Sequence, residues 1–189
     1  MLDWLAGGER RTKGIERIYE VAAEAIVERG LDRLSIEDIA VRAGCSRATI
    51  YRHAGGKRAI RDAVLARAIT RITDSVRRAV DGLDGEPRIA TAILSSLEAM
   101  RTDPVCVAFA GAGPAMRSIN SSLLSSPQLG RTAAELTGVD STEPIALEWI
   151  VRVVLALLYW PIPDPEDEAV LIKCYVAQAF SRAGASVGG

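Results

Sequence analysis

Two short helical segments joined by a tight turn near Gly44 constrain the fold of this chain more than any other feature. The first, SIEDIAVRA over 35–43, repeats apolar residues at helical spacing, and Ser35 stands where a helix N-cap is expected. Gly44 can adopt the positive φ that a sharp reversal requires. Ser46 can then cap a second helix over 47–54. Two short helices joined in this way form a helix-turn-helix.

The packing requirements of this motif are met by particular residues. Asp38 follows Ser35 by three positions, as in a capping box. Ala40 is small where the two helices must cross closely, and Cys45 and Ile50 fall on the inner side of the second helix. The outer side of that helix is polar, so the helix can enter the major groove of DNA with its N-terminal half toward the base edges.

The outward side chains suit a nucleic-acid partner. Arg47 can pair with guanine, and Thr49 can touch a thymine methyl group or a phosphate. The other polar and aromatic groups nearby suit phosphates, and the free N–H groups at the start of the next helix also attract anions. The predicted DNA contacts are Ser35, Ser46, Arg47, Thr49, Tyr51, Arg52, His53 and Lys57.

Enzymatic chemistry is a weaker interpretation of the same stretch. His53 is the only histidine, and a catalytic base would need a nucleophile or carboxylate partner that the nearby sequence does not supply. The segment GAGPAM at 111–116 is too short for a dinucleotide fingerprint and follows no predicted strand. We therefore expect no catalysis, no cofactor and no metal site.

The stretch GLDRLSIEDIAVRAGCSRATIYRHAGGKRAI, over 30–60, resembles the DNA-binding domain of the TetR family of bacterial transcriptional repressors. The similarity runs from about Ile15 to Leu65. It implies an all-α fold with a three-helix helix-turn-helix domain at 12–56, a connecting helix at 57–80, and a helical ligand-binding and dimerisation domain at 81–184.

One position departs from the family pattern. The family usually has phenylalanine where this chain has Ala54, and that ring anchors the loop after the recognition helix. Its loss removes about 1.5–3 kcal/mol of apolar burial. We therefore expect a looser loop over 54–56 and a less constrained Lys57.

The second half of the chain also has helical spacing, and no alternating β-branched run indicates a strand. DGLDGEP at 81–87 marks a boundary, and Asp103-Pro104 stops the helix that follows it. Pro144 lies in the first turn of a helix over 144–159 that is apolar nearly all round and must be buried on several sides. Asp164 is expected to cap a final helix over 165–182.

These apolar helices carry two further predictions. Helices 144–159 and 165–182 are expected to form the family's four-helix dimer interface. Glu148 and Arg152 can pair with each other, mark the dimer seam or bind a ligand, and we favour the seam. The predicted lining of an effector pocket, for which ordinary core packing is the simpler alternative at each position, is Met100, Phe109, Met116, Trp149, Val153 and Leu157.

The charge distribution fits a polyanion partner, although a solvated arginine-rich face would explain it equally well. Net charge is −1, but residues 42–78 hold ten basic residues and only two acids, Asp62 and Asp74. No signal peptide or secure membrane span is evident. The isolated cysteines predict a reducing cytoplasm and packing roles; they are Cys45, Cys106 and Cys174.

Together these features predict a homodimeric regulator, a repressor, that binds a palindromic DNA operator and is released by a small, mostly apolar effector. A protein-interaction scaffold on the same fold that no longer reads DNA is the alternative, and Ala54 is the feature that permits it. A small enzyme is the least supported interpretation.

Overall fold

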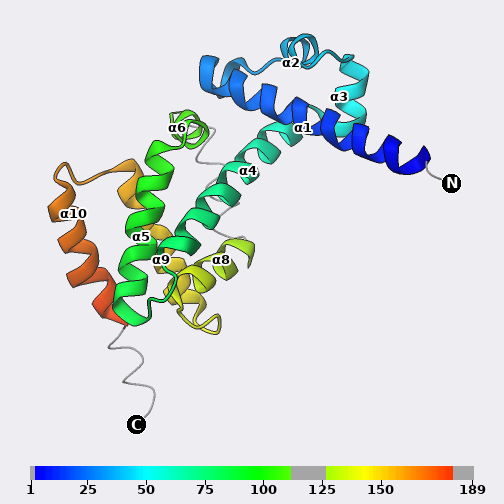
Figure 1. The fold of residues 1–189 in the computed structure, drawn as a ribbon. Coiled ribbons are helices and arrows are strands. Elements are labelled where there is room, and N and C mark those ends of the chain that lie inside the picture. Colours follow the sequence, from blue (N-terminus) through cyan, green and yellow to red (C-terminus); the bar gives the residue numbers. More distant parts are fainter. Residues whose placement is uncertain (1–2, 112–126, 181–189) are drawn as a thin grey trace. The chain divides into compact units, whose positions relative to one another are not determined.

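The computed structural model describes residues 3–111 and 127–180, and every regular element in those ranges is a helix (Figure 1). The predicted all-α fold class is therefore confirmed. The helices are α1 (Asp3–Arg29), the 3-10 turn η1 (Leu31–Arg33), α2 (Ile36–Ala43), α3 (Arg47–Ala54), α4 (Gly56–Ala79), α5 (Gly85–Thr102), α6 (Pro104–Ala110), α8 (Pro127–Thr137), α9 (Pro144–Tyr159), α10 (Pro165–Leu171) and the π-helical η2 (Ile172–Ala177).

The chain divides into two compact units. One comprises Met1–Ile69 with Pro104–Gly113, and the other comprises Thr70–Asp103 with Pro114–Gly189. The division passes through α4. It also groups α6, which lies in the predicted domain 81–184, with the first unit.

The first unit is built around α1. Both α2 and α3 pack on this helix, and α6 contacts it as well. The α2–α3 pair contributes Ile39 and Ile50, whose side chains are completely buried. Burial of such a side chain contributes about 1.5–3 kcal/mol, so these two residues anchor the short helices far more strongly than helix propensity does. Further core residues are Ile18, Val21, Ala22, Ala25, Ile26, Ile60, Val64 and Phe109.

The first helix is longer than its apolar spacing predicts. That spacing begins at Ile15, whereas α1 begins at Asp3. Residues between these positions include Leu5, Ala6 and Glu9, whose helix propensity is high.

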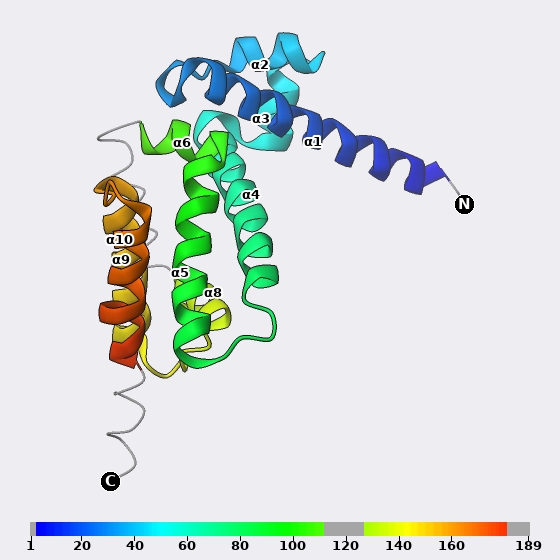
Figure 2. The same ribbon diagram turned by 60° about the vertical axis from the view of Figure 1, so that its left-hand side comes forward.

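The second unit has one apolar core shared by α5, α9 and η2 (Figure 2). Its buried residues are Ile89, Ala90, Ile93, Leu97, Ile150, Val153, Leu157, Ile172, Val176 and Ala177. α8 packs against both α5 and α9. The predicted helix over 144–159 is confirmed, but its burial is one-sided, because Leu147, Ile150, Val153 and Leu157 face inward while the opposite stripe is exposed.

The final helix corrects two expectations. Instead of a uniform α-helix over 165–182, α10 ends at Leu171 and continues as the π-helical η2. Ile172, Val176 and Ala177 are its buried residues. Cys174, expected to have a packing role, is exposed, and Val170 on α10 is exposed as well. Cys45 and Cys106 are half-buried.

Arg101 ties three helices of the second unit together. Its guanidinium on α5 donates to Glu168 Oε1 and Oε2 at 2.7 and 2.9 Å, and to the Leu157 carbonyl of α9 at 2.8 Å. The Glu168 side chain on α10 is only 6% exposed. The Arg101 hydrogen bonds hold the pKa of Glu168 below its usual value, against the raising effect of burial.

No helix among the described residues is both long and apolar enough to cross a membrane.

We expect Arg101→Ala to lower the free energy of unfolding by about 2–3 kcal/mol, because it leaves Glu168 buried without its partner. Arg17→Ala, which breaks an exposed pair with Glu20, should cost less than about 0.5 kcal/mol. Urea unfolding measures both.

Because the pKa of Glu168 is lowered in the folded chain, its stabilising contribution is complete above the pKa of a free glutamate and is lost as the pH falls through the lowered value. Glu168→Gln should remove that acid-side loss; equal unfolding energies for the two arginine variants would contradict the assignment.

Candidate nucleic-acid interface

Hydrogen bonds fix both ends of α2, and the one at its C-terminal end closes the turn to α3. Ser35 caps α2 by accepting from the Asp38 N–H at 3.4 Å. Gly44 has φ +66°, and the Cys45 N–H donates to the Ala40 carbonyl at 3.0 Å. This is the bond that closes a Schellman-type helix end, which needs the left-handed conformation at Gly44. The predicted cap and the predicted glycine turn are confirmed.

The carboxylate of Asp38 has a different role from the one a capping box assigns to it. It lies 3.1 Å from Arg42 Nε on its own helix and 3.2 Å from Arg29 Nη1 at the end of α1. Arg42 also donates to Glu28 at 2.9 Å. These ion pairs connect α2 to α1.

α3 begins with a second cap. Ser46 Oγ accepts from the Thr49 N–H at 3.1 Å, and the two hydroxyl groups share a hydrogen bond of 2.9 Å. Ile50 and Ala54 point into the unit, whereas Arg47, Tyr51 and Arg52 are exposed. The helix therefore presents to solvent Arg47, Tyr51 and Arg52, three of the side chains that the sequence predicts for DNA, and the cap satisfies one of the free N–H groups of its first turn.

Arg47 has a partner that sequence reasoning missed. Its Nη1 donates to Glu37 Oε1 on α2 at 2.9 Å, and both side chains are 65% exposed. The second Glu37 oxygen accepts from Ser35 Oγ at 2.9 Å. Hydrogen bonding by Arg47, then by the backbone and Ser35, lowers the pKa of Glu37 to about 2. The two residues stand ten positions apart on different helices, so no local spacing indicates the pair.

The junction between α3 and α4 depends on two glycines. Gly55 and Gly56 have φ of +75° and +84°. A Cβ on Gly56 would lie 3.0 Å from Tyr51 Cε1, so the tyrosine ring lies directly over the start of α4. Ala54 is buried, and Lys57 Nζ donates to the Asp32 carbonyl at 3.1 Å. Lys57 is thus held beside η1, which restrains it despite the missing phenylalanine.

His53 is half-buried on α3. Its Nδ1 is buried without a hydrogen-bond partner, a condition shared by no other buried side-chain nitrogen or oxygen in the described part of the chain. The position suits a ring that packs beside the exposed face rather than a base held ready by a carboxylate.

The predicted effector residues are not all brought together. Val153 and Leu157 share the core of the second unit, and Met100 on α5 is half-buried. Trp149 is 52% exposed on the outer side of α9, and Phe109 belongs to the first unit. Met116 lies outside the described residues. A cavity of about 290 Å³ in the second unit is lined by other side chains: Glu86, Pro87, Ala90, Thr91 and Lys173.

Comparison with known proteins identifies the motif. Residues 18–64 match the family described as bacterial regulatory proteins, tetR family. An uncharacterized HTH-type transcriptional regulator of Mycobacterium tuberculosis strain H37Rv is 28% identical over 197 residues, covering 97% of this chain and 93% of that protein. The HTH-type transcriptional activator FasR of Mycolicibacterium smegmatis is 32% identical over 95 residues, covering 47% of this chain and 43% of FasR.

Solved structures support the fold over nearly the whole chain. The crystal structure of the TetR family repressor AlkX from a Dietzia strain aligns with a TM-score of 0.65 at 18% identity, covering 88% of this chain and 97% of that one. A transcriptional regulator from Aquifex aeolicus aligns with a TM-score of 0.51 at 19% identity, covering 90% and 99%. Residues 18–64 therefore form a DNA-binding domain of the TetR family. The chain is a transcriptional regulator with a DNA-binding helix-turn-helix, as the sequence resemblance predicts.

Proposed function

We propose that this chain is a homodimeric repressor that reads a palindromic DNA operator through α3 and is released by a small, mostly apolar effector. The observation that carries the DNA-reading part is the presentation of α3: Ile50 anchors it, Ser46 caps it, and its exposed side carries Arg47 and Arg52. Operator binding would place its action in the bacterial cytoplasm.

The proposed contacts divide into two kinds. Arg47 and Thr49 lie in the first turn of α3, the part of a recognition helix that reaches base edges. Tyr51, Arg52 and His53 follow, and Lys57 lies at the start of α4; we assign these to phosphates. The N-terminal cap residues Ser35 and Ser46 complete the proposed set by orienting the two helices and facing the backbone of the duplex.

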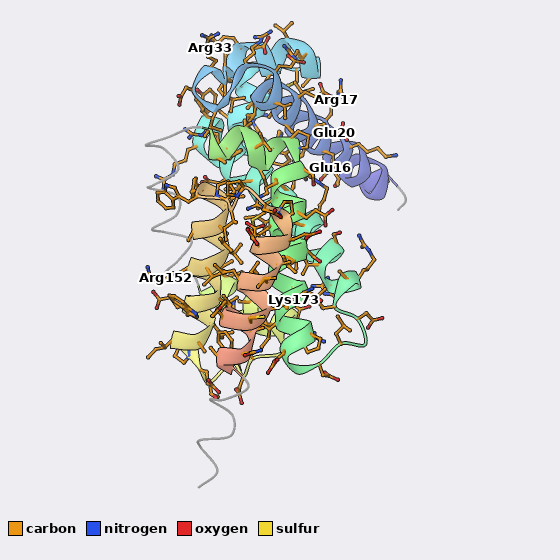
Figure 3. All side chains as sticks on the ribbon, turned by 90° about the vertical axis from the view of Figure 1, so that its left-hand side faces the viewer. Glu16, Arg17, Glu20, Arg33, Arg152 and Lys173 are labelled. Atoms are coloured by element: carbon orange, nitrogen blue, oxygen red, sulfur yellow. The ribbon has the colours of Figure 1, made fainter. Side chains whose placement is uncertain are left out.

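A dimer is proposed because one recognition helix alone gives weak binding. Two copies about 34–36 Å apart would read both halves of a palindrome. The surface that we assign to the dimer is the outer stripe of α9, where Ile145 is 83% exposed beside Trp149. Arg152 projects from the same helix (Figure 3) and donates to Glu148 at 3.1 Å. This internal pairing allows the stripe to be covered without an unpaired charge.

The effector is proposed to bind in the second unit, where Met100, Val153 and Leu157 supply apolar groups. The connecting helix, predicted over 57–80, would carry the response to the recognition helices by changing its direction. A ligand can achieve this only through different affinities for the two states.

The first prediction concerns DNA contacts. Genomic selection with the intact dimer should recover a palindromic site that the chain protects in a footprint. Arg52→Ala and Lys57→Ala should weaken binding to selected and unrelated duplexes alike, and each should lower the slope of log K against log salt by about one, because each variant binds one phosphate fewer. Arg78→Ala removes the same charge from the C-terminal end of α4 and should leave the slope unchanged. An intact dimer with no selective duplex binding would refute the proposal.

The second prediction concerns the dimer. Glutamates at the exposed apolar positions, Ile145→Glu with Trp149→Glu, should weaken self-association by about 2–4 kcal/mol, because they place charges in a desolvated interface. Val27→Glu, at another exposed apolar position on α1, is the matched control and should stay dimeric. Sedimentation velocity measures both. A double variant that sediments like the unmodified chain would exclude this stripe.

The third prediction concerns the effector. A panel of small apolar compounds should include one that raises the melting temperature with its concentration and releases the operator; at 100 times Kd the stabilisation is about 2.7 kcal/mol. Met100→Lys should abolish that stabilisation, since it places a charge in the proposed pocket. Glu98→Lys on the exposed side of the same helix should preserve it. An equal rise in melting temperature for both variants would show that Met100 does not line the effector pocket.

A further inference from the structure

The contact between Glu37 and Arg47 joins the start of α2 to the start of α3. It is an ion pair within the proposed DNA-reading face, and Glu37 is not among the proposed DNA contacts. The carboxylate is held on both oxygens, by Arg47 at 2.9 Å and by Ser35 at 2.9 Å. Ser35 is itself fixed as the α2 cap. The side chain of Arg47, which is assigned to base reading, therefore donates to an acceptor that is itself held by a second hydrogen bond.

We infer that Glu37 is a positioning residue that sets the direction of Arg47 for one base pair and reduces binding to unrelated DNA; this rests on the proposed function. An arginine carries five N–H donors in a planar fork. Engagement of Nη1 by Glu37 leaves the other edge of the fork, with Nε and Nη2, for the two acceptors of guanine. The fork then meets the base in one orientation.

The negative charge of Glu37 has a second effect. Phosphates attract the cations of the same face wherever the duplex lies, and this attraction supplies most sequence-independent binding. A carboxylate beside Arg47 repels phosphates and partly neutralises the guanidinium, so it opposes such contacts, whereas the free Nε and Nη2 edge can still bind a correctly placed guanine. The low pKa of Glu37 keeps this carboxylate charged throughout the physiological range. Specificity then comes from a penalty on wrong sites as well as from a gain at the right one.

The other ion pairs of the first unit do not share this arrangement. Arg42 with Glu28, and Arg67 with Glu16, join α1 to α2 and to α4 and leave α3 untouched. The Glu28–Arg42 contact has the same length, 2.9 Å, and Glu28 is exposed like Glu37. It therefore offers a matched control within the same unit.

The experiment selects preferred duplexes from a random library with the full-length chain and four variants: Glu37→Gln, Arg47→Ala, the double variant, and Glu28→Gln. Arg47→Ala should reduce preference at one base pair of each half-site by about 5–150-fold. Glu37→Gln should reduce preference at that same base pair by about two- to tenfold and raise affinity for unrelated duplex by about two- to tenfold. Glu28→Gln should change neither, and melting temperatures confirm that every variant is folded.

The double variant decides how Glu37 acts. If Glu37 works through Arg47, then Glu37→Gln adds no loss of preference once Arg47 is alanine. A loss at a different base pair would mean that Glu37 reads a base directly, and unchanged selectivity in Glu37→Gln would mean that the pair is idle; either result overturns the inference while leaving the proposed function standing. Absence of selective binding by the unmodified chain would overturn both.

Discussion

The left-handed conformation of Gly44 is the constraint on which the DNA-reading surface depends. It allows α2 to end sharply and the Cys45 N–H to donate to the Ala40 carbonyl, so that α3 can start at Arg47 after only three intervening residues. An added Cβ at Gly44 would meet no atom within 4 Å. The requirement is therefore conformational and not steric, and other L-residues would carry a backbone cost of about 1–2 kcal/mol. With the turn fixed, Ile39 and Ile50 lock both helices onto α1.

Charge in the first unit is organised around this frame. Acids of α1 and α2 pair with arginines that connect neighbouring helices. Arg67 on α4 donates from Nη1 and Nη2 to the two carboxylate oxygens of Glu16 at 2.5 and 2.6 Å. The centre of the Tyr19 ring lies 4.6 Å from the same guanidinium. α3 itself carries no acid. The net charge of the whole chain is only −1, but the exposed side of α3 is basic. The acid that pairs with its Arg47 is Glu37 on the adjacent helix α2.

Sequence reasoning predicts what is local. Caps, glycine turns and apolar spacing act over four residues or fewer, and the positions of α2, α3, α4 and α9 follow from them. The contacts that it misses join distant residues: Glu37 to Arg47 across a turn, and Arg101 to Glu168 across 67 positions. The π-helical η2 is missed for a related reason. Its apolar residues fit the spacing of an α-helix equally well, and only packing against α5 selects which of them are buried.

The apolar composition of α9 does not predict that one stripe of the helix is exposed. A helix that is apolar on nearly every side predicts burial on every side. Within its own unit α9 buries one stripe, through Ile150, Val153 and Leu157, and leaves Ile145 and Trp149 in water. Burial of that second stripe would be favourable, at about 25 cal/mol per Å² of apolar area. A two-fold axis would bring the same face of a second copy onto this stripe. Because Glu148 and Arg152 already pair with each other, covering the stripe in this way would leave no unpaired charge.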